Sequence, residues 1–207
     1  KKIKDFNIIG CPGCYPTSIL LPLIPLIKEN LIVSKTIIID SKSGYSGAGK
    51  KFEEKFNHKN LYKSTFAYSV THHRHMAELD QEIKKQSGKK INYVFNPHIV
   101  PSFRGIISSI YVKTKNKITG KKLLSTLKKF YKNNKFIKVV KYNQPIKTGD
   151  VLNTNMCQIS VCSSRYENKY TIFSTLDNLV KGASGQAVQN MNLLYGFNEI
   201  RGLKWDF

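Results

Sequence analysis

Residues 3–27 read IKDFNIIGCPGCYPTSILLPLIPLI, and this stretch decides how the chain begins to fold. The apolar run from Ile3 to Gly10 predicts a strand, and the Pro-Gly pair predicts a turn over Cys11 to Tyr15. From Pro16 onward the apolar residues recur at helical spacing, with Pro16 itself in the first turn. Pro22 and Pro25 are expected to kink or shorten that helix. The sequence therefore predicts a strand that enters a helix through a tight turn.

The rest of the chain predicts further strands and helices without regular alternation, which is typical of an α+β domain. We expect a mostly antiparallel or mixed sheet with helices on one face. The loop from Ser41 to Gly49 is too rich in Gly and Ser to predict a helix or a strand. The predicted strands are Lys35 to Asp40, Asn92 to Phe95, Gly105 to Lys113, Phe136 to Lys141, Met156 to Ser163 and Tyr170 to Ser174, and the helices are Met76 to Lys85, Lys121 to Lys132 and Gly182 to Leu194.

Length and composition indicate one domain, or one domain with a small appendage. The chain has 207 residues, of which 41% are hydrophobic, which is enough for a packed core. No run approaches the ~20 consecutive apolar residues of a membrane span. The start lacks the basic-then-apolar pattern of a signal peptide. Because the first residue is Lys1 rather than Met, we interpret the chain as a fragment or a processed protein.

The net charge of +21 is compatible with nucleic-acid binding, since Lys and Arg neutralise phosphates. Lysine supplies 30 of the 34 basic residues, whereas base readout and bidentate phosphate contacts favour arginine. The lysines are also spread along the chain, as on a solvated surface. We expect no specific nucleic-acid partner, and a basic binding module stays open as the non-enzymatic alternative.

Four cysteines, at positions 11, 14, 157 and 162, are too few for a disulfide scaffold in a chain of this length. Cys11 and Cys14 have the spacing of redox and zinc motifs. Pro-Gly separates them, however, and Cys157 and Cys162 lie in an alternating, strand-like run, which is not the compact arrangement of zinc ligands. A reduced, cytoplasmic protein without a metal is the simpler interpretation.

Cys14 is the strongest candidate for a catalytic nucleophile. It follows a Pro-Gly turn and precedes a predicted helix, whose free N–H groups and positive dipole end stabilise a thiolate. The same N–H groups can hold an oxyanion on an acyl carbon. On local context alone, an inert buried cysteine is an equal alternative.

A histidine cluster adds the base that a nucleophilic cysteine needs. Residues 71–75, Thr-His-His-Arg-His, contain three of the five histidines. His73 and His75 either share one side of an extended segment or begin the next helix. Glu78 follows His75 by one helical turn, where it can orient that ring. A surface turn or an adventitious metal site stays open as the plainer interpretation.

Two further segments can contact anions. The Ser43 to Gly49 loop can bring backbone N–H groups close to a phosphate, although its glycine spacing differs from that of a Walker loop. The segment from Phe95 to Gly105 reads as a rigid loop with two prolines, and its Arg104 suits a carboxylate or a phosphate. Plain surface loops are the alternative in both cases.

Taken in order, these segments resemble N-acetyl-gamma-glutamyl-phosphate reductases. Each motif is modest alone, but five in the family's order are a specific signal. Cys11, Ala77 and Ser184 depart from the usual residues without removing a group that the chemistry needs. The family's N-terminal dinucleotide-binding domain, with its Gly-rich fingerprint, is not in this sequence. The matching stretches are Pro12 to Thr17, Ser43 to Lys51, Ala67 to Val70 with His73 to His75 and Glu78, Pro97 to Ile106, and Lys181 to Asn192.

The resemblance implies NADPH-dependent reduction of N-acetyl-L-glutamyl 5-phosphate in arginine biosynthesis, through a thioacyl intermediate on Cys14, with His73 as acid/base. It also implies a catalytic domain like that of the glyceraldehyde-3-phosphate/aspartate-semialdehyde dehydrogenase superfamily. Residues 1–175 would form this catalytic and dimerisation domain, and residues 176–207 a helix and tail that pack on the dinucleotide-binding domain. The implied substrate-binding residues are Tyr68, His75, Glu78 and Arg104, and the implied NADP(H)-binding residues are Ser43, Gly44, Ser46, Gly47 and Asn190.

The same resemblance implies a cytoplasmic homo-oligomer, a dimer or a tetramer, that acts on a small molecule and not at a membrane. A sister enzyme of carrier-linked lysine biosynthesis uses almost the same motifs and stays open as an alternative. Aspartate-semialdehyde dehydrogenase shares the chemistry, but we expect different residues around its cysteine and histidine.

Overall fold

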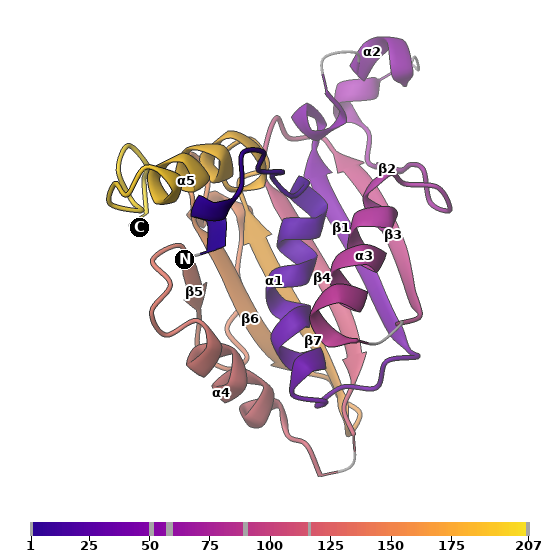
Figure 1. Ribbon diagram of the computed structural model, residues 1–207. Helices are drawn as coiled ribbons and strands as arrows, with labels where there is room; N and C mark the ends of the chain where they lie inside the picture. The colour runs from indigo at the N-terminus through magenta and orange to yellow at the C-terminus, as the bar shows by residue number, and fades with distance from the viewer. Residues whose placement is uncertain (1, 50–51, 57–59, 89–90, 116, 206–207) are drawn as a thin grey trace.

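Seven strands form one mixed sheet in a computed structural model that describes residues 2–49, 52–56, 60–88, 91–115 and 117–205 (Figure 1). The strand order is β2-β3-β1-β4-β7-β6-β5. β1 runs parallel to β3 and antiparallel to β4, so the expected mixed sheet is confirmed. The strands are β1 (Ile37–Gly44), β2 (Phe66–Ala67), β3 (Tyr93–Val100), β4 (Ile106–Lys113), β5 (Ile137–Val139), β6 (Cys157–Ser163) and β7 (Lys169–Leu176).

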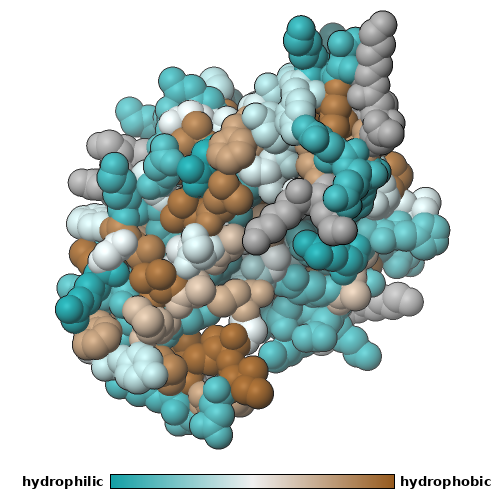
Figure 2. Space-filling view, turned by 90° about the horizontal axis from the view of Figure 1, so that it is seen from above, coloured by the Kyte–Doolittle hydropathy of each residue, from teal (hydrophilic) through white to brown (hydrophobic). Residues whose placement is uncertain are grey.

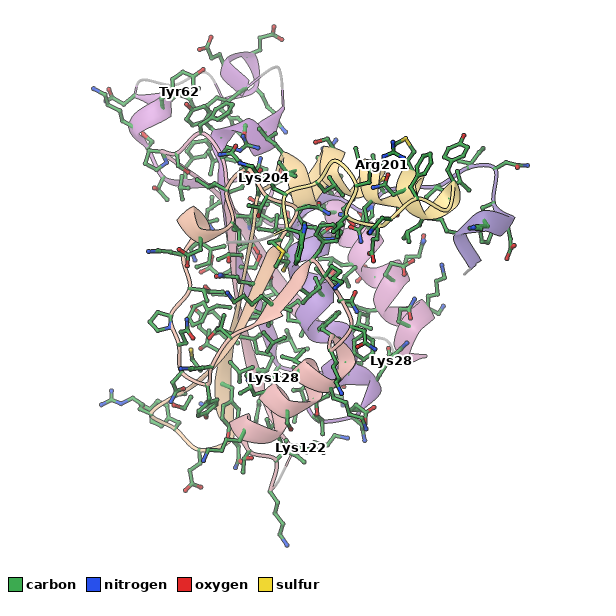
Figure 3. The ribbon with its side chains drawn as sticks, turned by 90° about the vertical axis from the view of Figure 1, so that its left-hand side faces the viewer. Lys28, Tyr62, Lys122, Lys128, Arg201 and Lys204 are labelled. Atoms are coloured by element: carbon green, nitrogen blue, oxygen red, sulfur yellow. The ribbon has the colours of Figure 1, made fainter. Side chains whose placement is uncertain are left out.

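The long helices lie against one face of the sheet, as expected, and the side view separates the two layers (Figure 3). Of the helices that the described residues form, none is long and apolar enough to cross a membrane. A π-helix, Val180–Ser184, leads directly into the last α-helix. The α-helices are α1 (Cys14–Lys28), α2 (Phe52–Lys55), α3 (His75–Ser87), α4 (Gly120–Phe130) and α5 (Gly185–Leu194), and short 3-10 helices lie at Lys2–Asp5, Tyr45–Ala48, Leu61–Lys63 and Thr148–Asp150.

The core lies between α1 and the sheet because side chains alternate across each strand. In β1, Ile37 and Ile39 are buried beneath the helices, whereas Ile38 points to the other face and is 46% exposed. α1 contributes Ile19 and Leu23, both almost fully buried. Register places the carboxyl end of β1 beside the end of β3, and the first turn of α1 lies over this edge of the sheet.

The strand expected from Ile3 to Gly10 is wrong. Lys2–Asp5 forms a 3-10 helix and residues 6–13 have no regular structure. Phe6 and Ile8 are exposed, at 59% and 89%, so these apolar side chains enter no core. A short apolar run becomes a strand only where another strand completes its hydrogen bonds, and none pairs with this segment in the described part of the chain.

α1 runs unbroken through its two prolines, so the expected shortening is wrong. Pro25 has no N–H, which leaves the carbonyl of Leu21, four residues earlier, without its helical partner. The hydroxyl of Tyr131, just after α4, donates to that carbonyl at 2.6 Å. A side chain from a neighbouring element thus supplies the hydrogen bond that the proline removes.

The two segments interpreted as loops are partly strand. Ser41 to Gly44 belongs to β1, and Tyr45–Ala48 is a 3-10 helix. β3 continues through Pro97 to Val100, so the rigid loop expected from residue 95 is wrong for its first half. Sheet neighbours on both sides of β1 supply hydrogen bonds that outweigh the weak strand propensity of Ser and Gly.

Candidate active site

The nucleophile candidate occupies the first position of α1. Gly13 is the N-cap in an extended conformation, and Cys14 is the first helical residue. Both carboxylate oxygens of Glu78 accept from the Gly13 N–H, each at 3.1 Å. Glu78 thus ties the first turn of α3 to the turn before Cys14. The sequence had suggested that Glu78 orients the ring of His75, and the structure instead directs it to the backbone of Gly13.

Burial raises the pKa of the Cys14 thiol to about 11. The N–H groups of Tyr15 and Cys14 and the charge of Arg74 act in the opposite direction, but they do not outweigh the loss of solvent. The thiol is therefore protonated at neutral pH. Attack by its sulfur requires a neighbouring group that accepts the proton.

The π-helix packs directly on this cysteine. A Cβ on Gly182 would lie 2.7 Å from the Cβ of Cys14 and 3.2 Å from its Cα. Only glycine permits that approach. π-helical turns are rare and are frequent at functional sites, and here the turn forms one wall beside the nucleophile.

His73 is buried and fixed on both ring nitrogens. Its Nδ1 accepts from the backbone N–H of His75 at 3.1 Å, and its Nε2 lies 3.2 Å from the Tyr68 hydroxyl. A nitrogen that accepts carries no proton, so the neutral ring holds its proton on Nε2, next to Tyr68. Burial, then the charges of Arg74 and Lys55, lower the pKa of His73 to about 4. The ring is therefore neutral at physiological pH.

His75 begins α3, which agrees with the second of the two arrangements suggested by the sequence. Its ring faces the nucleophile turn, since a Cβ on Gly13 would lie 2.5 Å from the His75 Nε2. Its buried Nδ1 has no hydrogen-bond partner among the described residues. Burial, then His73 and Arg74, lower the pKa of His75 to about 4.

The rings of His73 and His75 line a cavity of about 260 Å³, and Cys14 is not among its lining residues. It brings together Tyr68, His73, His75 and Gly47 from the residues expected at the site. Tyr15, which follows Cys14 directly, lies in the wall and donates to the His98 carbonyl at 3.0 Å. The lining residues are Tyr15, Gly47, Ala48, Lys55, Tyr68, Ser69 and His72 to His75.

Arg104, the expected substrate anchor, does not line this cavity. Its Nη2 donates to one oxygen of Asp177 at 2.9 Å and its Nε lies 2.8 Å from the other. Its Nη1 donates to Asn153 at 2.7 Å. Asp177 is fully buried. The guanidinium is thus occupied by an ion pair that joins the loop after β3 to the end of β7.

Three of the expected cofactor-binding residues are occupied by contacts within the protein. The hydroxyl of Ser43 donates to the Gly44 carbonyl at 3.0 Å. The Gly44 backbone packs on Arg104, and Ser46 accepts from the amide of Asn178 at 2.9 Å. Ser43, Gly44 and Ser46 are therefore directed to neighbouring parts of the protein in this structure.

Gly47 and Asn190 are placed differently. Gly47 lines the cavity. The side-chain amide of Asn190, on α5, donates to the exposed sulfur of Cys11 at 3.4 Å, near the nucleophile turn. These two are the expected cofactor residues that the structure leaves at the rim of the site.

Sequence reasoning missed three residues that shape this region. Asp177 and Asn178 follow β7 directly, and Asn178 accepts from the Gly105 N–H at 2.7 Å. An acid and an amide at the end of a buried strand were the available signal. Lys55 lines the cavity, but no sequence signal distinguished it from the other lysines, because its position at the site depends on the fold around it.

The fold and the nucleophile turn define a class of protein. The family described as semialdehyde dehydrogenase, dimerisation domain, matches residues 14–178, and the chain belongs to that family. Aspartate semialdehyde dehydrogenase II from Vibrio cholerae has the same fold, with a TM-score of 0.70 at 18% identity over 94% of this chain and 64% of that chain.

Curated relatives share more of the sequence than this solved structure does. The chain is 44% identical over 203 residues to the N-acetyl-gamma-glutamyl-phosphate reductase of Afipia carboxidovorans, covering 98% of this chain and 58% of the relative. It is 41% identical to a probable chloroplastic N-acetyl-gamma-glutamyl-phosphate reductase of Arabidopsis thaliana, covering 97% and 50%. The chain therefore spans little more than half the length of these relatives.

Proposed function

We propose that the chain is the catalytic part of an NADPH-dependent reductase that converts N-acetyl-L-glutamyl 5-phosphate to the 5-semialdehyde in arginine biosynthesis. The observation that carries the proposal is the position of Cys14 at the start of α1, beside His75 and the π-helix. The 44% sequence identity to the Afipia carboxidovorans reductase supports N-acetyl-L-glutamyl 5-phosphate as the substrate.

In the proposed reaction the Cys14 sulfur attacks the acyl carbon, the carbon–oxygen bond to phosphate breaks, and phosphate leaves with the bonding electrons. A thioester on Cys14 results. The thiol proton passes to His75, the ring next to the Gly13 turn, as the sulfur–carbon bond forms. Hydride transfer to the acyl carbon then allows the carbon–sulfur bond to break, which releases the aldehyde and leaves Cys14 as a thiolate.

His73 is proposed as the group that acts on the acyl oxygen. Its proton lies on Nε2, and its pKa of about 4 keeps the ring neutral, so it polarises the carbonyl as a hydrogen-bond donor. In the structure this N–H faces the Tyr68 hydroxyl, and we propose that the acyl oxygen takes the place of that hydroxyl when the substrate binds. His75 and Glu78 fix the arrangement through the backbone, and Arg104 acts at a distance by holding Asp177.

The nicotinamide cofactor supplies the hydride when it is bound. The residues described here do not fit the phosphates and adenosine of a dinucleotide, because Ser43, Gly44 and Ser46 are committed to internal contacts. We propose that Gly47 and Asn190 alone border its nicotinamide end. The rest of the cofactor would need a dinucleotide-binding domain such as the resemblance implies.

Two exposed apolar surfaces support the expected partners. The uncovered sheet face exposes Ile38, Val94 and Tyr111 by 46%, 54% and 43%, and we propose that it pairs with a second copy in a dimer or tetramer. Met191 on α5, with Tyr195 and Phe197 after it, is also exposed. Seen from above, this end of the molecule shows apolar patches among polar surface (Figure 2). We propose that residues 176–207 pack on the dinucleotide-binding domain through this apolar surface.

The four cysteines are free, and we propose on this ground that the protein works in the cytoplasm, where thiols stay reduced.

Substrate assays on the full-length protein test the proposal. Phosphate-dependent reduction of NADP by N-acetylglutamate semialdehyde, the reverse reaction, is expected. Turnover only with the carrier-linked lysine precursor would move the protein to the sister enzyme, and no turnover with either would contradict the reductase assignment.

A further inference from the structure

Two cationic side chains, both exposed at the surface, line the cavity that holds the histidines. They are Lys55, the last residue of α2, and Arg74, the residue before α3. The Lys55 ammonium lies 5.2 Å from the centre of the Phe56 ring and 5.9 Å from that of Tyr68. Such ring contacts hold an ammonium in place without neutralising it. Lys55 is thus fixed beside Tyr68, the side chain that contacts His73.

Neither cation is balanced by an acid. Within the described ranges, no ion pair joins Lys55 or Arg74 to a carboxylate, and no carboxylate lines the cavity. Glu78, the acid nearest in sequence to Arg74, is bonded to the Gly13 backbone. The charge of Arg74 contributes to the lowered pKa values of His73 and His75, and it partly offsets the effect of burial on the pKa of Cys14. Its field therefore reaches the reacting groups. The cavity is therefore an uncompensated positive site next to the nucleophile.

We propose that Lys55 and Arg74 form the subsite that holds the phosphoryl group of the acyl phosphate, and then the phosphate that leaves. This inference rests on the proposed reductase function. Breaking the carbon–oxygen bond places new negative charge on the departing oxygen, and two cations match a dianion better than the single charge of the substrate carboxylate. Arg104 cannot serve, because Asp177 and Asn153 occupy its guanidinium.

Kinetics of the reverse reaction in the full-length protein distinguish binding of phosphate from binding of the substrate carboxylate, because the KM for phosphate and the KM for the aldehyde are measured separately. Lys55→Gln and Arg74→Gln are each expected to raise the KM for phosphate at least about tenfold, the range for a lost hydrogen bond to a charged group, and to leave the KM for the aldehyde unchanged. Lys55→Arg is expected to recover most of the phosphate affinity. The matched control is Lys128→Gln on α4, at the opposite end of the molecule from Tyr62, which lies beside α2 (Figure 3).

A rise in the aldehyde KM without a rise for phosphate would mean that these cations hold the carboxylate, and would overturn the proposal. Unchanged constants for both would overturn it as well. Calorimetry with inorganic phosphate, on variants whose melting temperatures match the parent, reads the subsite without turnover. Phosphate binding that Lys55→Gln weakens supports the subsite even if the reductase assignment fails, whereas equal binding by parent and variant refutes it whatever the activity.

Discussion

Gly182 determines how closely the π-helix approaches Cys14. In Gly182→Ala the new methyl group would meet the Cys14 Cβ at 2.7 Å and the Leu176 side chain at 3.3 Å, so the nucleophile must shift. Misplacement by about 1 Å can cost about 10²-fold in rate, and we expect a loss of that size in kcat/KM. Gly149→Ala is the control, because nothing lies within 4 Å of its added methyl group. Equal activity of the two variants would mean that the close packing has no catalytic role.

His73 and His98 differ in their surroundings and should differ in their contribution to the rate. His73 lines the cavity, whereas the His98 ring lies 3.2 Å from Asp40 and does not. His73→Ala is expected to lower kcat about 10²–10³-fold, the usual loss when one donor to the acyl oxygen is removed, and His98→Ala to leave kcat nearly intact. His73→Gln should retain part of the rate, since its amide can still donate to the acyl oxygen. Greater loss in His98→Ala than in His73→Ala would reverse the assignment.

At the residue scale the sequence identified candidates by chemistry but not by contact. Cys14 and His73 were predicted because a thiol at a helix start and a clustered imidazole are recognisable from type and spacing. Arg104 was given a substrate role on its type alone, and the partner that occupies it, Asp177, lies 73 residues away. Lys55 was missed for the same reason. Which cation is free depends on acids that are distant in sequence.

At the scale of single elements, α1 depends on a hydroxyl from another part of the chain. Tyr131→Phe leaves the Leu21 carbonyl without a partner, and we expect a loss of about 1–2 kcal/mol in the free energy of unfolding. Urea denaturation measures it. In a Pro25→Ala background the restored N–H can bond to Leu21, so Tyr131→Phe should cost less there. The same cost in both backgrounds would show that the hydroxyl does not compensate for the proline.

Elements with strong patterns were predictable, and those decided by neighbours were not. The β-branched run before Asp40 and the amphipathic pattern of α4 predict elements of the right type. The bounds of α4 are right to within two residues, whereas β1 ends four residues beyond its predicted end. Ser41 to Gly44 extends β1 because β3 and β4 flank it. Ile3 to Gly10 has strand-like residues but no partner strand among the described residues. Strand formation is settled by pairing, which a single segment does not encode.

For the whole molecule, the buried His73 and the half-buried His75 make stability depend on pH. Their pKa values are lowered from 6.5 to about 4 in the folded state. Between these values the unfolded chain binds more protons than the folded one, so the free energy of unfolding falls as pH falls through this window. Urea midpoints at several pH values between 4 and 6.5 measure the slope. The double variant His73→Gln, His75→Gln should show a shallower slope, and an unchanged slope would contradict the buried neutral rings.

The central claim is that Cys14 carries the acyl group during the reaction, and mass spectrometry of the trapped protein tests it most directly. The full-length protein is mixed with N-acetyl-L-glutamyl 5-phosphate without nicotinamide cofactor, in a Cys11→Ser background because Cys11 is exposed and shares the same peptide. We expect one N-acetylglutamyl group on the peptide that contains Cys14, and none after Cys14→Ser. An acyl group on Cys157 or Cys162, or phosphate release at the normal rate by Cys14→Ser, would contradict the account.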